Sequence, residues 1–129
     1  AIADIDKDGY LDIVTANIGE PNVIYFGSKQ QRYKRKVTFD SSNDKSYSIS
    51  VGDLDRDNDT DIVIGNYGAP NTVFVNTEKG NSWKKTALSD KKFNTYDVMI
   101  QDLNGDKKPD IIESNSDEQN VYYFNKHKS

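Results

Sequence analysis

The apolar residues of this chain gather in short runs that alternate with polar, turn-forming stretches. The runs are rich in Val, Ile, Tyr and Phe, which favour β-strands. None approaches the roughly 18 consecutive apolar residues that a membrane-spanning helix needs, so we expect no membrane insertion. The clearest runs are 13–14, 23–26, 62–64, 73–75, 98–100 and 121–124. This pattern predicts an all-β chain of short strands.

The pattern repeats with a period of 49 residues, which is the spacing of Asp4, Asp53 and Asp102. The same interval relates the apolar positions and the Asn positions of each unit without insertion or deletion. These matching sets are Ile13, Ile62 and Ile111; Asn17, Asn66 and Asn115; and Asn22, Asn71 and Asn120. Self-similarity at such a spacing indicates repeats that pack on one another.

Each unit is predicted to contain four short antiparallel strands. In the central unit we expect them at 47–54, 61–65, 72–76 and 83–88, separated by turn-forming residues. Four strands in about 40 to 50 residues are typical of one blade of a β-propeller. We therefore expect one domain of three blades at approximately 1–45, 46–94 and 95–129, the last of which is incomplete because it stops after its third strand.

Composition leaves these repeats in need of extra stabilisation. Only 34% of the 129 residues are hydrophobic, the mean hydropathy is −0.85, and there is no cysteine to form a disulfide. The acidic residues supply another means, because each unit has an Asp-rich loop of nine residues between its first and second predicted strands. We name residues 4–12, 53–61 and 102–110 the first, second and third Asp loops.

The Asp loops have the oxygen spacing of calcium sites. Side-chain oxygens fall at loop positions 1, 3, 5 and 9, and position 7 would add a main-chain carbonyl. Ca²⁺ takes six to eight oxygen ligands, and alternate residues of a curled loop can point at one ion. The candidate ligands are Asp4, Asp6, Asp8, Tyr10 and Asp12; Asp53, Asp55, Asp57, Asp59 and Asp61; and Asp102, Asn104, Asp106, Lys108 and Asp110. The sequence thus predicts up to three calcium ions per chain.

The alternatives to a calcium loop agree less well with these residues. Turn formation alone does not need four carboxylates in nine residues, and an EF-hand needs helical flanks and a Glu at position 12, which only Glu113 provides. Magnesium demands tighter octahedral geometry, and zinc prefers His or Cys, whereas His127 is the single histidine. Position 6 should need positive φ, which suits Gly9 better than Lys107. Since Asn104 also replaces a carboxylate, we expect the third site to be the weakest.

The repeated Asp loop, followed by a Val/Ile strand and an Asn-rich turn as in 52–71, resembles the FG-GAP and VCBS repeat family, whose members include the blades of integrin α-subunit propellers. The resemblance covers nearly the whole chain. It implies a propeller of usually six to eight blades with a calcium loop between the first two strands of each blade. It also implies an extracellular or cell-surface setting and a role in adhesion, lectin-like binding or scaffolding, although some relatives are polysaccharide lyases.

We therefore expect a non-enzymatic, calcium-binding module for adhesion, glycan or protein binding, or scaffolding. The alternative is a calcium-dependent polysaccharide-active domain, but no catalytic residue stands out. The turns at 17–22, 66–71 and 115–120 should lie opposite the Asp loops, where Tyr67, Asp117 and Gln119 are candidate ligand contacts, although the Asn residues there could simply build the turns.

The predicted partners follow from geometry, because three blades do not close a ring. Two copies could form a six-bladed homodimer, or further blades of a longer chain could complete it. The basic stretch 29–36 is predicted to decorate an exposed outer strand, and since no nucleic-acid motif accompanies it, we expect no nucleic-acid partner.

Overall fold

The computed structural model describes residues 1–30 and 32–126, which contain eleven strands and no helix. The described part of the chain accordingly holds no helix that could cross a membrane. The strands are β1 (Ile2–Ala3), β2 (Asp12–Thr15), β3 (Asn22–Tyr25), β4 (Lys36–Asp40), β5 (Lys45–Gly52), β6 (Asp61–Tyr67), β7 (Thr72–Asn76), β8 (Trp83–Ala87), β9 (Thr95–Gln101), β10 (Asp110–Asn115) and β11 (Val121–Tyr123). The all-β prediction is confirmed.

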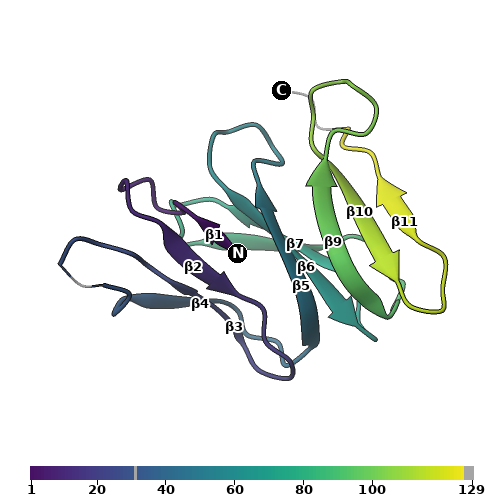
Figure 1. The fold of residues 1–129 in the computed structure, drawn as a ribbon, viewed down its shortest axis with the longest axis horizontal. Coiled ribbons are helices and arrows are strands. Elements are labelled where there is room, and N and C mark those ends of the chain that lie inside the picture. The colour runs from purple at the N-terminus through teal and green to yellow at the C-terminus, as the bar shows by residue number, and fades with distance from the viewer. Residues whose placement is uncertain (31, 127–129) are drawn as a thin grey trace.

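The strands form three antiparallel sheets in chain order. We name β1–β4 the first sheet, β5–β8 the central sheet and β9–β11 the third sheet, which has three strands. Each sheet is a meander in which every strand pairs with the next along the chain. Figure 1 shows the three sheets side by side as a fan, which does not close into a ring within the described residues. The described residues therefore contain two four-stranded sheets and one sheet of three strands in a repeated arrangement.

The central sheet differs from the prediction mainly in its first strand. β5 begins at Lys45 and ends at Gly52, where the sequence predicted 47–54. A register shift between Ser46 and Ser48 lets pairing with β6 continue as far as Tyr67. The strand ends at Gly52 because the next residue starts the second Asp loop, whose backbone bonds to its own side chains.

Two apolar cores lie between the sheets, and β6 contributes to both. Its Ile62 and Ile64 belong to the first core, between the first and central sheets, while Val63 belongs to the second core, between the central and third sheets. Alternate side chains of a strand point to opposite faces, so a sheet covered on both faces has a continuous apolar strand. Full burial of each such side chain contributes about 1.5 to 3 kcal/mol.

The stacking places all three Asp loops along one edge of the molecule. They connect β1 to β2, β5 to β6 and β9 to β10, and in Figure 1 they lie at the upper ends of the three sheets. The turns that connect β2 to β3, β6 to β7 and β10 to β11 lie at the opposite edge. The repeated sequence motif thus forms a row of equivalent loops along one edge of the molecule.

The prediction for the basic stretch 29–36 was wrong. β4 begins only at Lys36, so the stretch precedes the strand, and residue 31 lies outside the described residues. Arg35, at its end, instead forms an ion pair with Asp6 in the first Asp loop and lies 3.8 Å from the centre of the Phe26 ring. Part of the positive charge therefore faces the acidic loop instead of covering an edge.

Candidate metal centre

Each Asp loop curls through two residues in the left-handed backbone region. They occupy positions 4 and 6, and the pairs are Lys7 (φ 62°) and Gly9 (φ 93°), Arg56 (φ 64°) and Asn58 (φ 71°), and Gly105 (φ 77°) and Lys107 (φ 66°). The sequence predicted position 6 alone. Position 4 was missed, although Gly105 was a signal for it, because the other two loops have long basic residues there.

Main-chain N–H groups inside the loops hold the Asp side chains inward. In the first loop, Gly9 N donates to Asp4 Oδ2 (3.0 Å) and Tyr10 N donates to Asp8 Oδ1 (2.9 Å). The same two bonds recur in the second loop, to Asp53 and Asp57, and in the third, to Asp102 and Asp106. Asx-type bonds of this kind stabilise a tight turn and fix where the carboxylates point.

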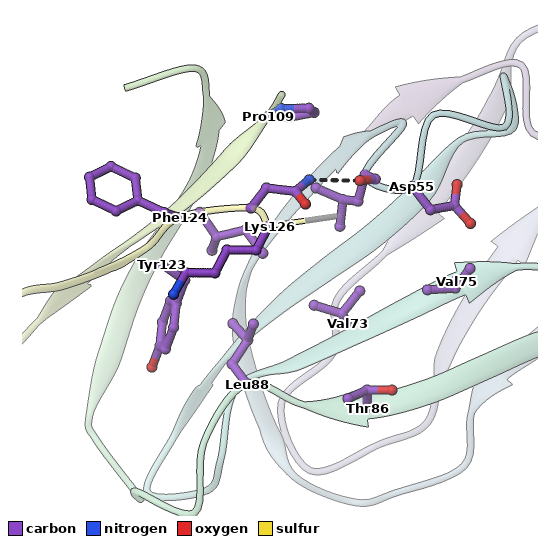
Figure 2. Close-up of a pocket in the computed structure, with 12 residues that line it drawn as sticks. Asp55, Val73, Val75, Thr86, Leu88, Pro109, Tyr123, Phe124 and Lys126 are labelled. Carbon is purple, nitrogen blue, oxygen red and sulfur yellow. Dashed lines mark hydrogen bonds between the residues drawn. The ribbon is translucent and has the colours of Figure 1, made fainter. Parts of the chain in front are cut away.

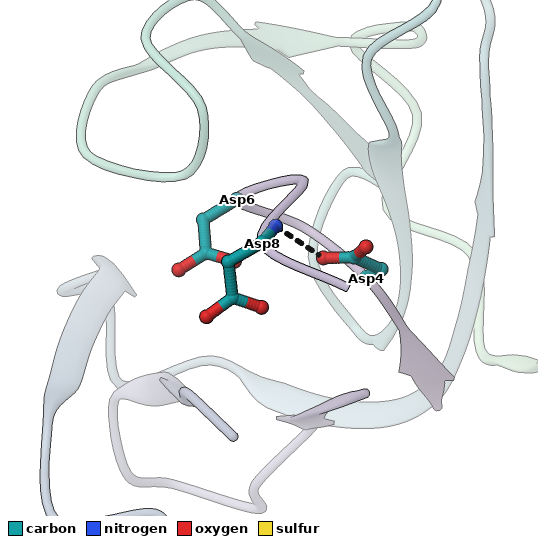
Figure 3. Close-up of side chains that lie close together, drawn as sticks. All are labelled: Asp4, Asp6 and Asp8. Carbon is teal, nitrogen blue, oxygen red and sulfur yellow. Dashed lines mark hydrogen bonds between the residues drawn. The ribbon is translucent and has the colours of Figure 1, made fainter. Parts of the chain in front are cut away.

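This curl brings carboxylates together in all three loops. One oxygen from each of Asp4, Asp6 and Asp8 lies within 4.8 Å of the others, and Figure 3 shows the three side chains close together around the loop. The second loop assembles Asp53, Asp55 and Asp57 in the same way. The third assembles Asp102, Asp106 and Asp110, because position 3 is Asn104, whose Oδ1 accepts a bond from Asp106 N (3.2 Å).

The carboxylates at position 9 have a second role that the sequence did not reveal. Asp61 is fully buried, and its two oxygens accept bonds from Leu54 N (2.8 Å) and Asn76 N (3.0 Å). Asp12 and Asp110 bond the equivalent pairs of N–H groups. In the first two loops this residue is not part of the cluster within 4.8 Å. Position 9 therefore ties its Asp loop to the end of the third strand of the same sheet.

The residues at position 7 contribute no side chain to the carboxylate clusters. Tyr10, Asp59 and Lys108 each donate their main-chain N–H to the carboxylate at position 5. Their predicted contribution was a carbonyl oxygen, so side chains as different as Tyr and Lys are compatible with the same loop.

Burial and mutual repulsion raise the pKa of several loop carboxyls. Burial, opposed by hydrogen bonds from Asn76 and Leu54 and reinforced by the charges of Asp55 and Asp57, raises the pKa of Asp61 to about 6. Burial also raises the pKa of Asp6, Asp12 and Asp55, with neighbouring carboxylates acting in the same direction. The negative charge of these four carboxyls, all in the first and second loops, is thus only partly compensated by the protein, and a divalent cation would stabilise it.

The edge opposite the Asp loops has a cluster of three tyrosines. Tyr47 and Tyr96, at equivalent positions of β5 and β9, have ring centres 5.5 Å apart, and Tyr67 lies 5.2 and 5.7 Å from them. Tyr47 and Tyr96 are 39% and 52% exposed, so the cluster is a surface feature. The sequence singled out Tyr67 alone, because only the packing of β5 against β9 brings the other two beside it.

The Asn residues of the turns beside this cluster build the turns. Asn22 Oδ1 accepts a bond from Asn17 N (2.7 Å), and Asn71 and Asn120 do the same for Asn66 N and Asn115 N. Asn22 Nδ2 also donates to Ser46 Oγ of the next sheet (2.9 Å), and Asn71 Nδ2 likewise donates to Thr95 Oγ1 (2.8 Å). Their structural role therefore explains their repetition.

The family model of the FG-GAP-like repeat matches the chain twice, over residues 4–64 and 53–113. The two matches together cover more than half of the chain, and they are offset by the same 49 residues as the Asp loops. Each begins at the first Asp of one loop and ends within the second strand of the following sheet, β6 or β10. A comparison with curated proteins gave no match.

Proposed function

Because the chain belongs to the family of FG-GAP-like repeats, we propose that it is a non-enzymatic binding module of β-propeller blades in which each Asp loop binds one calcium ion. The observation that carries this proposal is the carboxylate cluster that recurs at the same place in all three loops. The candidate ligand atoms of these clusters are carboxylate oxygens, which suit a hard cation such as Ca²⁺.

In each loop the side chains at positions 1, 3 and 5 would hold the ion. The main-chain carbonyl at position 7 and a remaining lone pair of the position 9 carboxylate would complete its coordination. When bound, the ion neutralises the carboxylates, and three ions would change the formal net charge from −4 to +2. Because position 9 also bonds to the end of the third strand, the ion would stiffen a whole sheet.

The tyrosine cluster is the surface that we propose contacts the ligand. Tyr47 and Tyr96 are both partly exposed, and exposed aromatic patches are uncommon unless they serve an interaction. A glycan or glycoprotein fits because sugar rings stack on aromatic faces and bond to hydroxyls. The calcium loops, at the other edge, would hold the blades in register so that the cluster keeps its shape.

We propose that the module works outside the cell or at its surface. Calcium sites of extracellular modules have Kd values on the order of 10⁻⁴ to 10⁻³ M, which suits partly exposed ligands such as those in the Asp loops. Calcium at extracellular concentration would keep such sites filled.

The outer faces of the first and third sheets require a partner to complete a propeller. Inside the chain, Asn76 Nδ2 donates to Ile5 O (3.3 Å) and Asn125 Nδ2 donates to Leu54 O (2.7 Å). The central sheet therefore bonds to the first Asp loop, and the third sheet bonds to the second Asp loop. In the first sheet the residue equivalent to Asn76 and Asn125 is Gly27, which has no side-chain amide to donate such a bond. A second copy would therefore lack this bond at the closing junctions, which favours further blades over the homodimer.

Calcium titration by calorimetry tests the metal sites, and binding to immobilised glycans and glycoproteins tests the tyrosine cluster. Tyr96→Ser should reduce binding at least tenfold, whereas Tyr33→Ser, at a tyrosine that is 42% exposed, should not. Equal loss in both variants would contradict the assigned surface. Turnover of a polysaccharide in the presence of calcium would contradict the non-enzymatic function.

A further inference from the structure

The guanidinium group of Arg35, in the segment that precedes β4, is held against the first Asp loop by three contacts. Its Nη2 forms the ion pair with Asp6 Oδ2, and its Nη1 donates to Asn81 Oδ1 (3.3 Å). The same group lies 3.8 Å from the centre of the Phe26 ring, which is within the range of a cation–π contact. Partners from three segments of the chain fix this side chain better than a single exposed ion pair would.

Asn81 belongs to the turn between β7 and β8, and this turn also packs on the first Asp loop through contacts that do not involve Arg35. Asn76 Nδ2 donates to Ile5 O (3.3 Å), and Asn76 Oδ1 accepts a bond from Gly80 N (2.7 Å). A Cβ atom added to Gly80 would lie 2.9 Å from Ile5 Cγ2, so the turn and the loop are in close contact there. Removal of the guanidinium group should therefore leave the turn in place.

Asp6 is the carboxylate that the positive charge stabilises. Its side chain is only 12% exposed, and its Oδ1 accepts a long bond from Asp8 N (3.4 Å) while its Oδ2 bonds to Arg35. Asp6 also contributes an oxygen to the cluster with Asp4 and Asp8 that Figure 3 shows. Arg35 therefore bonds to the carboxylate at position 3 of the loop, one of the positions proposed to hold calcium.

The residue 49 positions after Arg35 is Lys84 of β8. Within the described residues, Lys84 forms no ion pair with the second Asp loop. The chain therefore offers a matched control for Arg35, because Lys84 has the same charge at the same place in the next repeat without the contact to a loop carboxylate.

We propose that Arg35 is a built-in counter-ion of the first Asp loop, which stabilises the metal-free loop and opposes calcium binding there. This inference rests on the calcium sites proposed above. A calcium ion and the guanidinium group repel each other, and both are attracted to the negative charge of Asp6. Because coupling between two binding events is reciprocal, calcium in the loop should weaken the contacts of Arg35 by the same factor by which Arg35 weakens calcium binding.

The size of the effect follows from the exposure of the charge. Orientation of Asp6 by Arg35 would favour calcium, but Asp8 N already bonds to Asp6 inside the loop. Repulsion should therefore dominate. Because 43% of the Arg35 side chain is exposed, water screens its charge, and we expect it to raise the calcium Kd of the first loop by only about threefold.

A site-resolved titration tests the proposal. CaCl₂ is titrated into the whole ¹⁵N-labelled chain, and the main-chain amides of Gly9 and Asn58 report on the first and second loops, because each donates to the first carboxylate of its loop. Arg35→Gln should lower the Kd of the first loop about threefold and leave that of the second unchanged. Arg35→Lys, which keeps the charge, should lower it less. Lys84→Gln should leave the Kd of the first loop unchanged.

Melting curves separate the effect of charge from a merely structural role of the side chain. In chelator, Arg35→Gln should lower Tm by about 2 °C, because Asp6 loses its counter-ion. In saturating calcium the difference should disappear, since the bound ion neutralises Asp6 in both chains. A structural role alone would lower Tm equally in the two conditions and would contradict the proposal.

The two possible negative results of the titration are distinguishable. Calcium shifts in both loops, with the same Kd of the first loop in the unchanged chain and in Arg35→Gln, would overturn this inference and leave the calcium sites standing. No saturable shift in either loop would overturn the proposed function, and the inference about Arg35 with it.

Discussion

The second and third Asp loops follow the same backbone path with different side chains. Both turn through left-handed residues at positions 4 and 6, and both bond the carboxylates at positions 1 and 5 to main-chain N–H groups. The second loop, however, gathers the carboxylates at positions 1, 3 and 5, and the third replaces position 3 by Asn104. The loop therefore keeps its backbone conformation when the number of carboxylates in it changes.

The third loop also accommodates its unfavourable Lys107 by a change elsewhere. Its glycine stands at position 4, as Gly105, where the second loop has Arg56. Each loop thus has one residue at these two positions that tolerates positive φ well, Asn58 in the second and Gly105 in the third. The same turn can therefore form whether the residue that favours positive φ stands at position 4 or at position 6.

The largest expected effect is on stability and comes from position 9. Asp61→Ala would leave the N–H groups of Leu54 and Asn76 without acceptors, at a cost of about 2 to 4 kcal/mol even in a chelator. Asp110→Ala should cost less, because Leu103 is 44% exposed and water can replace the lost bond. Urea denaturation measures both. An equal loss from Asp57→Ala in chelator would contradict the separate role of position 9.

Removing a carboxylate from position 5 should affect calcium binding more in the second loop than in the third. Asp57→Ala leaves two of the three clustered carboxylates there, and we expect at least a tenfold loss of affinity at that site. Asp106→Ala should reduce the total calcium-induced rise in Tm by less, because the third site starts weaker. Calorimetric titration of each variant, with melting curves in calcium and in chelator, measures the difference.

Exchange of the residues at position 3 should exchange the affinities of the two loops. Asn104→Asp adds one charge near the ion and should strengthen the third site by about 1 kcal/mol, roughly fivefold. Asp55→Asn should weaken the second site by a similar factor. If Asn104→Asp left the third site unchanged in a calcium titration, position 3 would not be a ligand there.

The smallest effect concerns the backbone of the third loop. Lys107→Gly should raise stability by up to about 1 kcal/mol, because glycine adopts the observed φ of 66° without strain. Lys108→Gly is the matched control, since Lys108 is not among the residues with positive φ, and it should lower stability slightly. Thermal melts in chelator compare them without a contribution from metal.

The strands and the spacing of the Asp loops were predictable because they depend on local patterns. Runs such as 62–64 and 73–75 have strand composition, and the 49-residue period places Asp53 and Asp102 without any tertiary information. The double role of Asp61 was not predictable in this way. Its hydrogen bonds join residues 7 and 15 positions away, and only the folded sheet brings them together.

Contacts between residues far apart in the sequence were the least predictable part of the site. Arg35 reaches Asp6 across 29 residues, although the sequence placed it on an outer strand. Asn76 bonds Ile5 O across 71 residues, and its repetition as Asn125 carries no meaning until the sheets are stacked. The pocket between the central and third sheets (Figure 2) likewise forms only in the folded chain, because its lining comes from segments that lie far apart between residues 54 and 126.

The central claim is that the Asp loops are calcium sites, and a calorimetric titration of the metal-free chain with CaCl₂ tests it most directly. We predict binding of up to three ions per chain, the weakest in the third loop, with Kd values no weaker than the order of 10⁻³ M. We also predict a higher Tm in calcium than in chelator. No saturable heat up to several times that concentration, together with identical melting curves, would contradict the claim.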